Sequence, residues 1–257
     1  MLVLLSCAKT MSAVSKVKVP LTTIPRFQKE AAEIVLQMSQ FSVDELERLL
    51  RVNAKIAVEN YKRYQAFHAE TTPELPALLA YTGIVFKRLN PKDFSAEDFG
   101  YAQEHLRLTS FCYGLLRPLD VIRAYRLEGD VVLPELGNQT LFSYWRSRLT
   151  DTFIEDIRSA GGILCNLASD EMKSLFDWKR VESEVRVVTP EFHVWKNGKL
   201  ATIVVYTKMS RGEMTRFILK NKIGNPEELK GFSWEGFEFD ESLSDERKLV
   251  FINGMGE

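Results

Sequence analysis

Apolar and polar residues follow patterns that divide the chain into one early strand, a long helical portion and a strand-rich end. The run Leu-Val-Leu-Leu at residues 2–5 is short, continuous and apolar, which predicts a buried strand. Residues 6–10 are predicted to form a loop at its carboxyl end, and residues 11–25, rich in Ser, Thr and Pro, a longer loop. Helical spacing of apolar residues predicts helices at 26–40, 53–67, 96–113 and 139–159. A capping box at 42–45 predicts the start of one further helix.

The stretch 104–129 combines a helical pattern with signals that end a helix. Its apolar positions recur at three- and four-residue spacing: Leu108, Phe111, Cys112 and Leu115. Gly114 weakens such a helix, and Pro118 disfavours the helical region for the residue before it. A second short apolar run follows at 119–122. The pattern predicts a helix, a tight hairpin and then a shorter element.

The remainder of the chain turns from helices to strands. Asn197-Gly198 has the composition of a two-residue hairpin turn between strands. The predicted elements are a strand at 163–167, a helix capped by Ser169 or Asp170, strands at 192–195 and 200–206, a basic helix at 211–222, and strands at 232–239 and 249–252. This mixed order, without a repeat or an evident linker, predicts a single α+β domain over residues 1–257, with a mixed β-sheet flanked by helices.

Composition narrows the class of protein. Hydrophobic residues make up 45% of the 257 residues and charged residues 27%, as in an ordinary globular chain, and the net charge is −1. Any anion-binding site must therefore be a local cluster of cations. The three cysteines are widely spaced, which favours reduced thiols over a disulfide framework or a zinc site. Reduced thiols are typical of the cytosol, so we expect a cytoplasmic protein. No run approaches the roughly 18 apolar residues of a membrane span.

Two clusters of basic residues could bind an anion. The first lies in 107–126 and contains only Asp120 as an acid; its cations are Arg107, Arg117, Arg123 and Arg126. The second is offset by Glu213 alone; its cations are Lys208, Arg211, Arg216, Lys220 and Lys222. Guanidinium groups near free backbone amides suit phosphate groups. Alternatively, acids elsewhere neutralise both clusters, including the eight acids in 227–248.

Candidates for catalysis are few. Asp170 and Glu171 follow a predicted strand and could serve as acid and base or hold a metal, although the residues alone favour capping of a helix and its dipole. The histidines are assigned structural roles because each lies in a helix or strand pattern: His68, His105 and His193. The sequence has no nucleophile elbow, P-loop or dinucleotide-binding glycine motif. We therefore expect no cofactor and no metal site.

Four separated stretches together resemble a known family. They are Ser6-Cys7-Ala8-Lys9-Thr10; His105-Leu-Arg with Tyr113-Gly-Leu-Leu-Arg-Pro-Leu-Asp120 and Tyr125-Arg-Leu-Glu128; Asn166-Leu-Ala-Ser-Asp-Glu171; and Arg211-Gly212 with Arg216-Phe217-Ile218. Their order and spacing are similar to those of the YaaA family of bacterial peroxide-stress proteins. The likeness covers essentially the whole chain.

The resemblance implies a cytosolic protein with a mixed α/β fold, a positively charged cleft and DNA binding. It also implies that the protein helps the cell to survive hydrogen peroxide by limiting free intracellular iron and damage to DNA and protein. An embedded helix-hairpin-helix element would lie at about 96–126, with its hairpin at 113–117. Leu116 stands there in place of the second glycine that such hairpins favour.

The leading hypothesis is a protein that binds duplex or junction DNA with little sequence specificity, through phosphate contacts and without catalysis. The residues assigned to DNA or phosphate binding are Lys9, Arg107, Gly114, Arg117, Arg123, Arg126, Lys208, Arg211 and Arg216. The rival hypothesis is an enzyme for a small phosphorylated or nucleotide-like substrate, with Lys9, Asp170 and Glu171 as catalytic candidates beside Arg126 and Lys208. Direct iron binding by Asp170 and Glu171 is a third, weaker reading, since two adjacent carboxylates without His or Cys make a poor iron site.

Overall fold

The predicted first strand, β1 (Leu2–Leu5), lies at the centre of the main sheet with all four side chains buried. The computed structural model describes residues 1–196 and 198–254. In it, β1 pairs in parallel with β3 (Leu106–Ser110) on one side and with β8 (Ile163–Asn166) on the other. Because all four side chains are buried, both faces of β1 are covered, and a continuous apolar run is what this position requires.

The main sheet is mixed, as predicted. Its strand order is β11-β12-β9-β8-β1-β3-β4, with β10 also paired to β9. The remaining strands of this sheet are β4 (Gly114–Leu116), β9 (Arg186–Lys196), β10 (Lys199–Ala201), β11 (Phe237–Phe239) and β12 (Lys248–Asn253). Five neighbouring strands run parallel and three antiparallel strands lie at its margins. Two small sheets pair β2 (Leu75–Pro76) with β5 (Val121–Ile122), and β6 (Val132–Leu133) with β7 (Gln139–Thr140).

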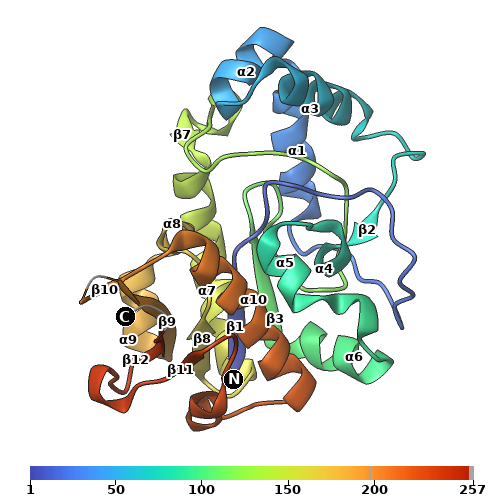
Figure 1. Ribbon diagram of the computed structural model, residues 1–257. Helices are drawn as coiled ribbons and strands as arrows, with labels where there is room; N and C mark the ends of the chain where they lie inside the picture. Colours follow the sequence, from blue (N-terminus) through green and yellow to red (C-terminus); the bar gives the residue numbers. More distant parts are fainter. Residues whose placement is uncertain (197, 255–257) are drawn as a thin grey trace.

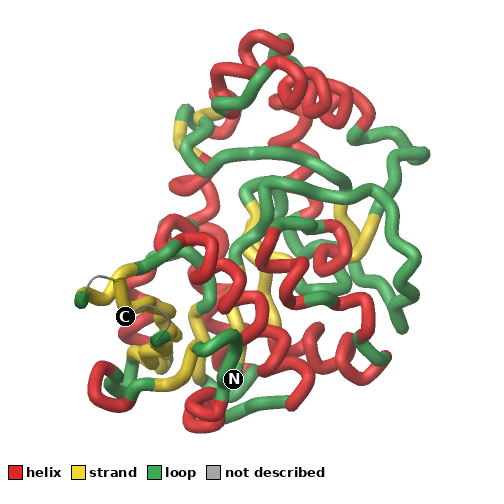
Figure 2. The backbone as a smooth tube through the Cα atoms, in the orientation of Figure 1, coloured by secondary structure: helices red, strands yellow, loops and turns green. Residues whose placement is uncertain are grey.

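Helices cover both sides of the main sheet (Figure 1). The helices are α1 (Gln28–Met38), α2 (Val43–Leu50), α3 (Ala54–Ala66), α4 (Ala77–Ala80), α5 (Ile84–Leu89), α6 (Ala96–His105), α7 (Leu141–Ser159), α8 (Asp170–Lys173), α9 (Trp178–Glu184) and α10 (Val204–Asn221). Helices α7 and α9 contact each other and the sheet, while α10 contacts α5 and α6. Helices α1, α2 and α3 form the upper end of the molecule, and long loops run between that end and the sheet (Figure 2). The predicted α+β class is confirmed.

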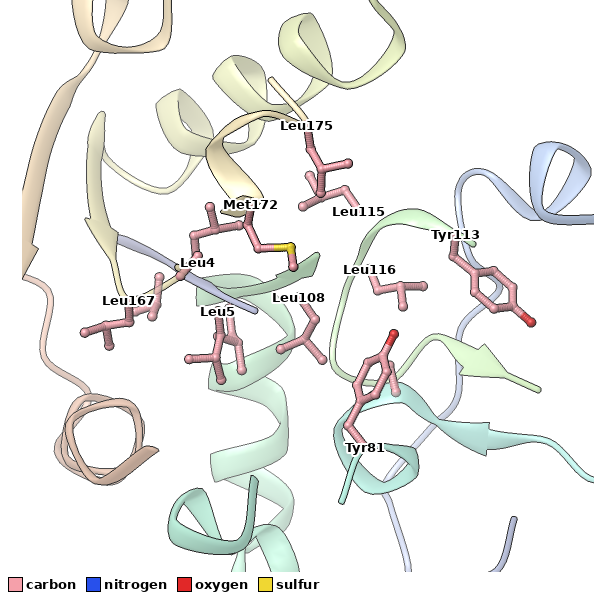
Figure 3. Packing of buried hydrophobic residues seen from close by; sticks show 14 of the residues in the cluster. Leu4, Leu5, Tyr81, Leu108, Tyr113, Leu115, Leu116, Leu167, Met172 and Leu175 are labelled. Carbon is pink, nitrogen blue, oxygen red and sulfur yellow. The ribbon is translucent and has the colours of Figure 1, made fainter. Parts of the chain in front are cut away.

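The core is densest where β1 ends. Figure 3 shows Leu4 and Leu5 of β1 beside Leu108 of β3, with Leu167 and Met172 closing over them. Each of these side chains is at most 5% exposed. The loops that leave the carboxyl ends of β1 and β8 therefore start from a rigid, fully packed base.

The helix predicted at 96–113 is wrong in its second half. It ends at His105, and residues 106–110 become β3, which turns back into β4 as a β-hairpin. Pairing of β3 with β1 gives its backbone hydrogen-bond partners that local periodicity cannot reveal. Gly114, at φ +69°, begins the returning strand. Residues 96–126 thus contain one helix and a β-hairpin, and the expected helix-hairpin-helix element is not what they form.

The predicted strand at 200–206 is also wrong beyond Ala201. The strand ends there and α10 begins at Val204, earlier than the predicted helix at 211–222. The β-branched run at 203–205 favours a strand locally, but Ile203 is the N-cap and Val204 and Val205 begin a long helix. Of the predicted hairpin turn, Asn197 lies outside the described residues. The strand predicted at 232–239 is confined to β11, and the one predicted at 249–252 is β12.

Candidate functional site

A pocket opens where the loops after β1 and β8 diverge. The chain continues from β1 to β3 on one side and later returns to β8 on the other, the arrangement at which open α/β sheets commonly bind ligands. The cavity has a volume of about 310 Å³. Its walls come from the loop after β1, the start of α5, the segment 125–127, the loop after β8, and α10.

Hydrogen bonds fix the two strand-end loops relative to each other. The backbone N–H of Ser169 donates to Oγ of Ser6 at 2.9 Å. The N–H of Cys7 donates to Oγ1 of Thr109 at 3.2 Å. On the opposite wall, a Cβ on Gly83 would lie 2.8 Å from Cβ of Ala8, so glycine permits the start of α5 to approach the loop. The pocket is therefore built by contacts between segments far apart in the sequence.

The inner part of the pocket is apolar. We call the following buried side chains the apolar floor: Leu5, Phe86, Phe111, Tyr125, Leu127, Leu167 and Met172. The hydroxyl group of Tyr125 already bonds those of Tyr81 and Ser110, at 2.7 and 2.6 Å. The floor can therefore exclude water from a bound apolar group but offers little polar recognition.

Four cations line the same pocket: Lys9, Arg126, Lys208 and Arg211, here called the pocket cations. Glu128 accepts hydrogen bonds from two of them, from Nζ of Lys9 at 2.7 Å and from Nη2 of Arg126 at 3.4 Å. Its side chain is only 10% exposed, so it is a buried counter-ion. Even with the second carboxylate, Glu171, in the lining, the four cations leave an excess of positive charge in the pocket.

Several charged groups in the pocket lack partners. Within residues 1–196 and 198–254, no hydrogen bond or ion pair holds the side chains of Lys208, Arg211 or Glu171. The Nε atoms of Arg126 and Arg211 are buried without an acceptor. Burial lowers the pKa of Arg211, and the distant charge of Asp170 only partly opposes this. Unpaired buried donors are costly, which is typical of groups that await a ligand.

The other predicted phosphate-binding residues are not brought to this pocket. Each of these cations has its own carboxylate: Arg107 with Asp156 at 2.6 Å, Arg117 with Asp120 at 2.9 Å, Arg123 with Glu74 at 3.0 Å and Arg216 with Asp93 at 2.6 Å. Gly114 serves packing, since a Cβ there would lie 2.7 Å from Cζ3 of Trp145. Of the nine predicted residues, the pocket thus gathers Lys9, Arg126, Lys208 and Arg211.

The two acidic candidates are separated. Asp170 has a side chain that is 93% exposed and accepts a bond from Nζ of Lys173 at 2.7 Å, which lowers its pKa. It does not line the pocket, whereas Glu171 does. In the described part of the chain, no group of three or more His, Cys, Asp and Glu side chains is arranged to hold a metal ion.

Cys7 faces the pocket but is not a reactive thiol. Burial raises its pKa to about 12, and the nearby carboxylates of Glu171 and Glu128 add to that effect, while a hydrogen bond with Thr109 opposes it. Reactive cysteines have lowered pKa values and are partly exposed. Cys7 therefore acts as a small packing residue of the pocket wall.

The pocket also contains residues that the sequence did not single out. The apolar floor draws on segments around 86, 111, 125 and 167, whose proximity follows only from the sheet topology. Glu128 belongs to the family-like stretch 125–128, but its role as the counter-ion of Lys9 and Arg126 was not predicted. In residues 1–196 and 198–254, no helix combines the length and apolar character of a membrane span.

Comparison with known proteins gives a consistent family. A family model described as "Peroxide stress protein YaaA" matches residues 1–243. A UPF0246 protein of Bacteroides thetaiotaomicron is 99% identical over the full length of both chains. UPF0246 proteins of Phocaeicola vulgatus and Crocosphaera subtropica are 62% and 38% identical, each across 98% of this chain and across 98% and 100% of their own.

Proposed function

This chain belongs to the peroxide stress protein YaaA family, and we propose that it acts in the cytosol by binding a small phosphorylated or nucleotide-like ligand in the pocket at the ends of β1 and β8. The observation that carries the proposal is the set of unpaired cationic groups there, above all the guanidinium of Arg211. Guanidinium groups bind phosphate through two parallel hydrogen bonds. An anionic ligand would satisfy donors that otherwise have no acceptor.

The dimensions of the cavity support a small ligand. Pockets that enclose small molecules have volumes of about 300–1,000 Å³, and this one has about 310 Å³. Such a space admits one phosphorylated metabolite, whereas a DNA duplex could touch only its opening. If the site also performs chemistry, Glu171 is the carboxylate that faces the ligand, and Asp170 is not.

Calorimetric titration with ribose 5-phosphate tests the proposal. We expect saturable binding to the full chain and a loss of at least about tenfold in Arg211→Ala, since a charge-assisted hydrogen bond contributes roughly 1.5–3 kcal/mol. Arg216→Ala is the matched control, because Arg216 lies on the same helix but is bound to Asp93. Absence of binding, or equal losses in the two folded variants, would refute the proposal.

A second candidate function is the binding of duplex or junction DNA without sequence specificity, which would limit iron-dependent damage to DNA. The observation in its favour is that Lys9 and Lys208 are exposed at the pocket opening, where a phosphate backbone could contact them. Mobility shifts over a range of salt test it, because phosphate contacts make affinity fall steeply with salt. If DNA binds by this route, Lys208→Ala should flatten the dependence of affinity on salt. Arg117→Ala should leave that dependence unchanged, because the guanidinium of Arg117 is already paired.

A further inference from the structure

The arrangement of apolar and charged groups in the pocket specifies the ligand more closely. We infer that the pocket takes a ribonucleoside monophosphate, with its base on the apolar floor, its ribose hydroxyls at Glu171 and its phosphate at the pocket cations. The inference rests on the proposed function and adds the class of ligand and a residue that determines specificity. No part of it depends on which base is present.

The pocket has two chemically distinct zones. Its inner zone is the apolar floor, with aromatic rings from Phe86, Phe111 and Tyr125. Its outer zone carries the charges, since Lys9, Lys208 and Glu171 are exposed while the floor is buried. A ligand that fits both zones has a flat or apolar body at one end and an anion at the other. A nucleobase and a phosphate meet these two requirements.

Glu171 indicates which group of the ligand lies between its base and its phosphate. It is an unpaired carboxylate in a pocket with an excess of cations, so it neither neutralises Arg211 nor caps a neighbouring helix. A carboxylate accepts hydrogen bonds and repels a phosphate, so it requires a donor on the ligand. Ribose hydroxyls are donors placed between base and phosphate, and an acidic residue binds them in dinucleotide-binding folds.

Glu171 and the pocket cations line the same pocket. Glu171 is the second residue of the short helix α8, directly after Asp170, whose charge acts on Arg211 of α10. Glu171 also lies near Cys7, two residues before Lys9 on the opposite loop. The carboxylate therefore shares the pocket with Lys9 of the loop after β1 and with Lys208 and Arg211 of α10. A phosphate at those cations leaves the adjacent sugar within the zone of Glu171.

Calorimetry with matched nucleotides tests the inference. The probes are AMP, 2′-deoxyAMP, UMP and 2′-deoxyUMP, with ribose 5-phosphate and inorganic phosphate as references. We expect the wild-type chain to bind each ribonucleotide about tenfold more tightly than its deoxy form, the effect of one hydrogen bond to a charged group. Glu171→Gln should lose most of this preference. Asp170→Asn removes the same charge from the neighbouring residue and should retain it.

The outcomes separate the inference from the proposed function. Equal affinity for ribo- and deoxyribonucleotides in the wild type, or an undiminished preference in Glu171→Gln, overturns the inference. If ribose 5-phosphate still binds in an Arg211-dependent manner, the proposed function stands without it. If none of the phosphate compounds binds, the proposed function fails as well. Melting temperatures of both variants confirm that each one is folded.

Discussion

Two arginine-containing regions of this molecule look alike in sequence and differ in what their charges do. In the segment 107–123, Arg107, Arg117 and Arg123 each bind a carboxylate. In the pocket, Glu128 is the carboxylate that the structure pairs with cations, and Arg211 and Lys208 are left without one. The first region uses arginine to join parts of the fold, and the second keeps cations available. Whether each cation has a carboxylate partner, and not how many basic residues lie together, therefore distinguishes a structural cluster from a binding site.

The difference has a physical cost that identifies the functional region. A buried donor without an acceptor destabilises the folded state, and a bound ligand is one group that can compensate for it. The pairs of the first region carry no such penalty. Substitutions should consequently affect stability in the first region and affinity in the second.

The largest effect is expected at Arg107. Arg107→Ala should lower the free energy of unfolding by about 3–5 kcal/mol, because it leaves the buried carboxylate of Asp156 without its main partner. Arg26, which also contacts Asp156 at 3.3 Å but is half exposed, provides the control: Arg26→Ala should cost less than about 1 kcal/mol. Urea unfolding measures both. Similar costs for the two variants would show that Arg107 is not a structural anchor.

Gly114 should show the next largest effect. Gly114→Ala places a side chain at φ +69° and a Cβ 2.7 Å from the ring of Trp145, so we expect a loss of about 2–4 kcal/mol. Gly100→Ala, in the helix α6 with open space around it, should be neutral or slightly stabilising. If Gly114→Ala weakens ligand binding while stability is unchanged, the assignment of this glycine to packing is wrong.

An acid-dependent effect of intermediate size is expected at Asp98, which joins α6 to α10. Burial alone would raise its pKa, but hydrogen bonds from Lys220 and Lys222 outweigh burial and hold the pKa well below its ordinary value. Its contribution, on the order of 2 kcal/mol, is present above the unfolded pKa near 4 and is lost as pH falls toward the folded value. The destabilisation in Asp98→Asn should therefore begin to shrink below about pH 5 and continue to shrink as the pH falls toward the folded value.

Unfolding of Asp98→Asn and of the exposed control Asp44→Asn at several pH values checks this sign. The control should differ little from the wild type throughout. A gap between Asp98→Asn and the wild type that widens on acidification would contradict the linkage.

The smallest change in stability is expected at Arg211, together with the largest loss of binding. Arg211→Met removes a guanidinium whose buried Nε lacks an acceptor and keeps a chain of similar shape, so the variant should be as stable as the wild type or up to about 1 kcal/mol more stable. Affinity for ribose 5-phosphate should fall at least about tenfold. Thermal unfolding and calorimetry on the same samples measure both. A marked loss of stability would place Arg211 with the structural arginines.

The sequence predicted the parts of this structure whose signals are local. The apolar run of β1 and the cap at Ser42 identified a strand and a helix start without any tertiary information. The β-hairpin at 106–116 was missed because its first strand is stabilised by pairing with β1, about a hundred residues earlier. Local helical spacing carries no trace of such a partner.

The site was only partly predictable for the same reason. Asp120 lies three residues from Arg117, so their pairing was visible in the sequence. Asp156 lies 49 residues from Arg107 and Asp93 123 residues from Arg216, so neither neutralised cation could be recognised. The cations that stay available are defined by the absence of a partner, a property of the folded chain alone.

The most direct test of this account is a crystal structure of the chain with AMP, because it locates the bound phosphate. The account predicts electron density for the phosphate beside the guanidinium of Arg211 in the pocket at the ends of β1 and β8, with the ribose at Glu171. Phosphate bound at the hairpin 113–117, beside Arg117, would contradict it.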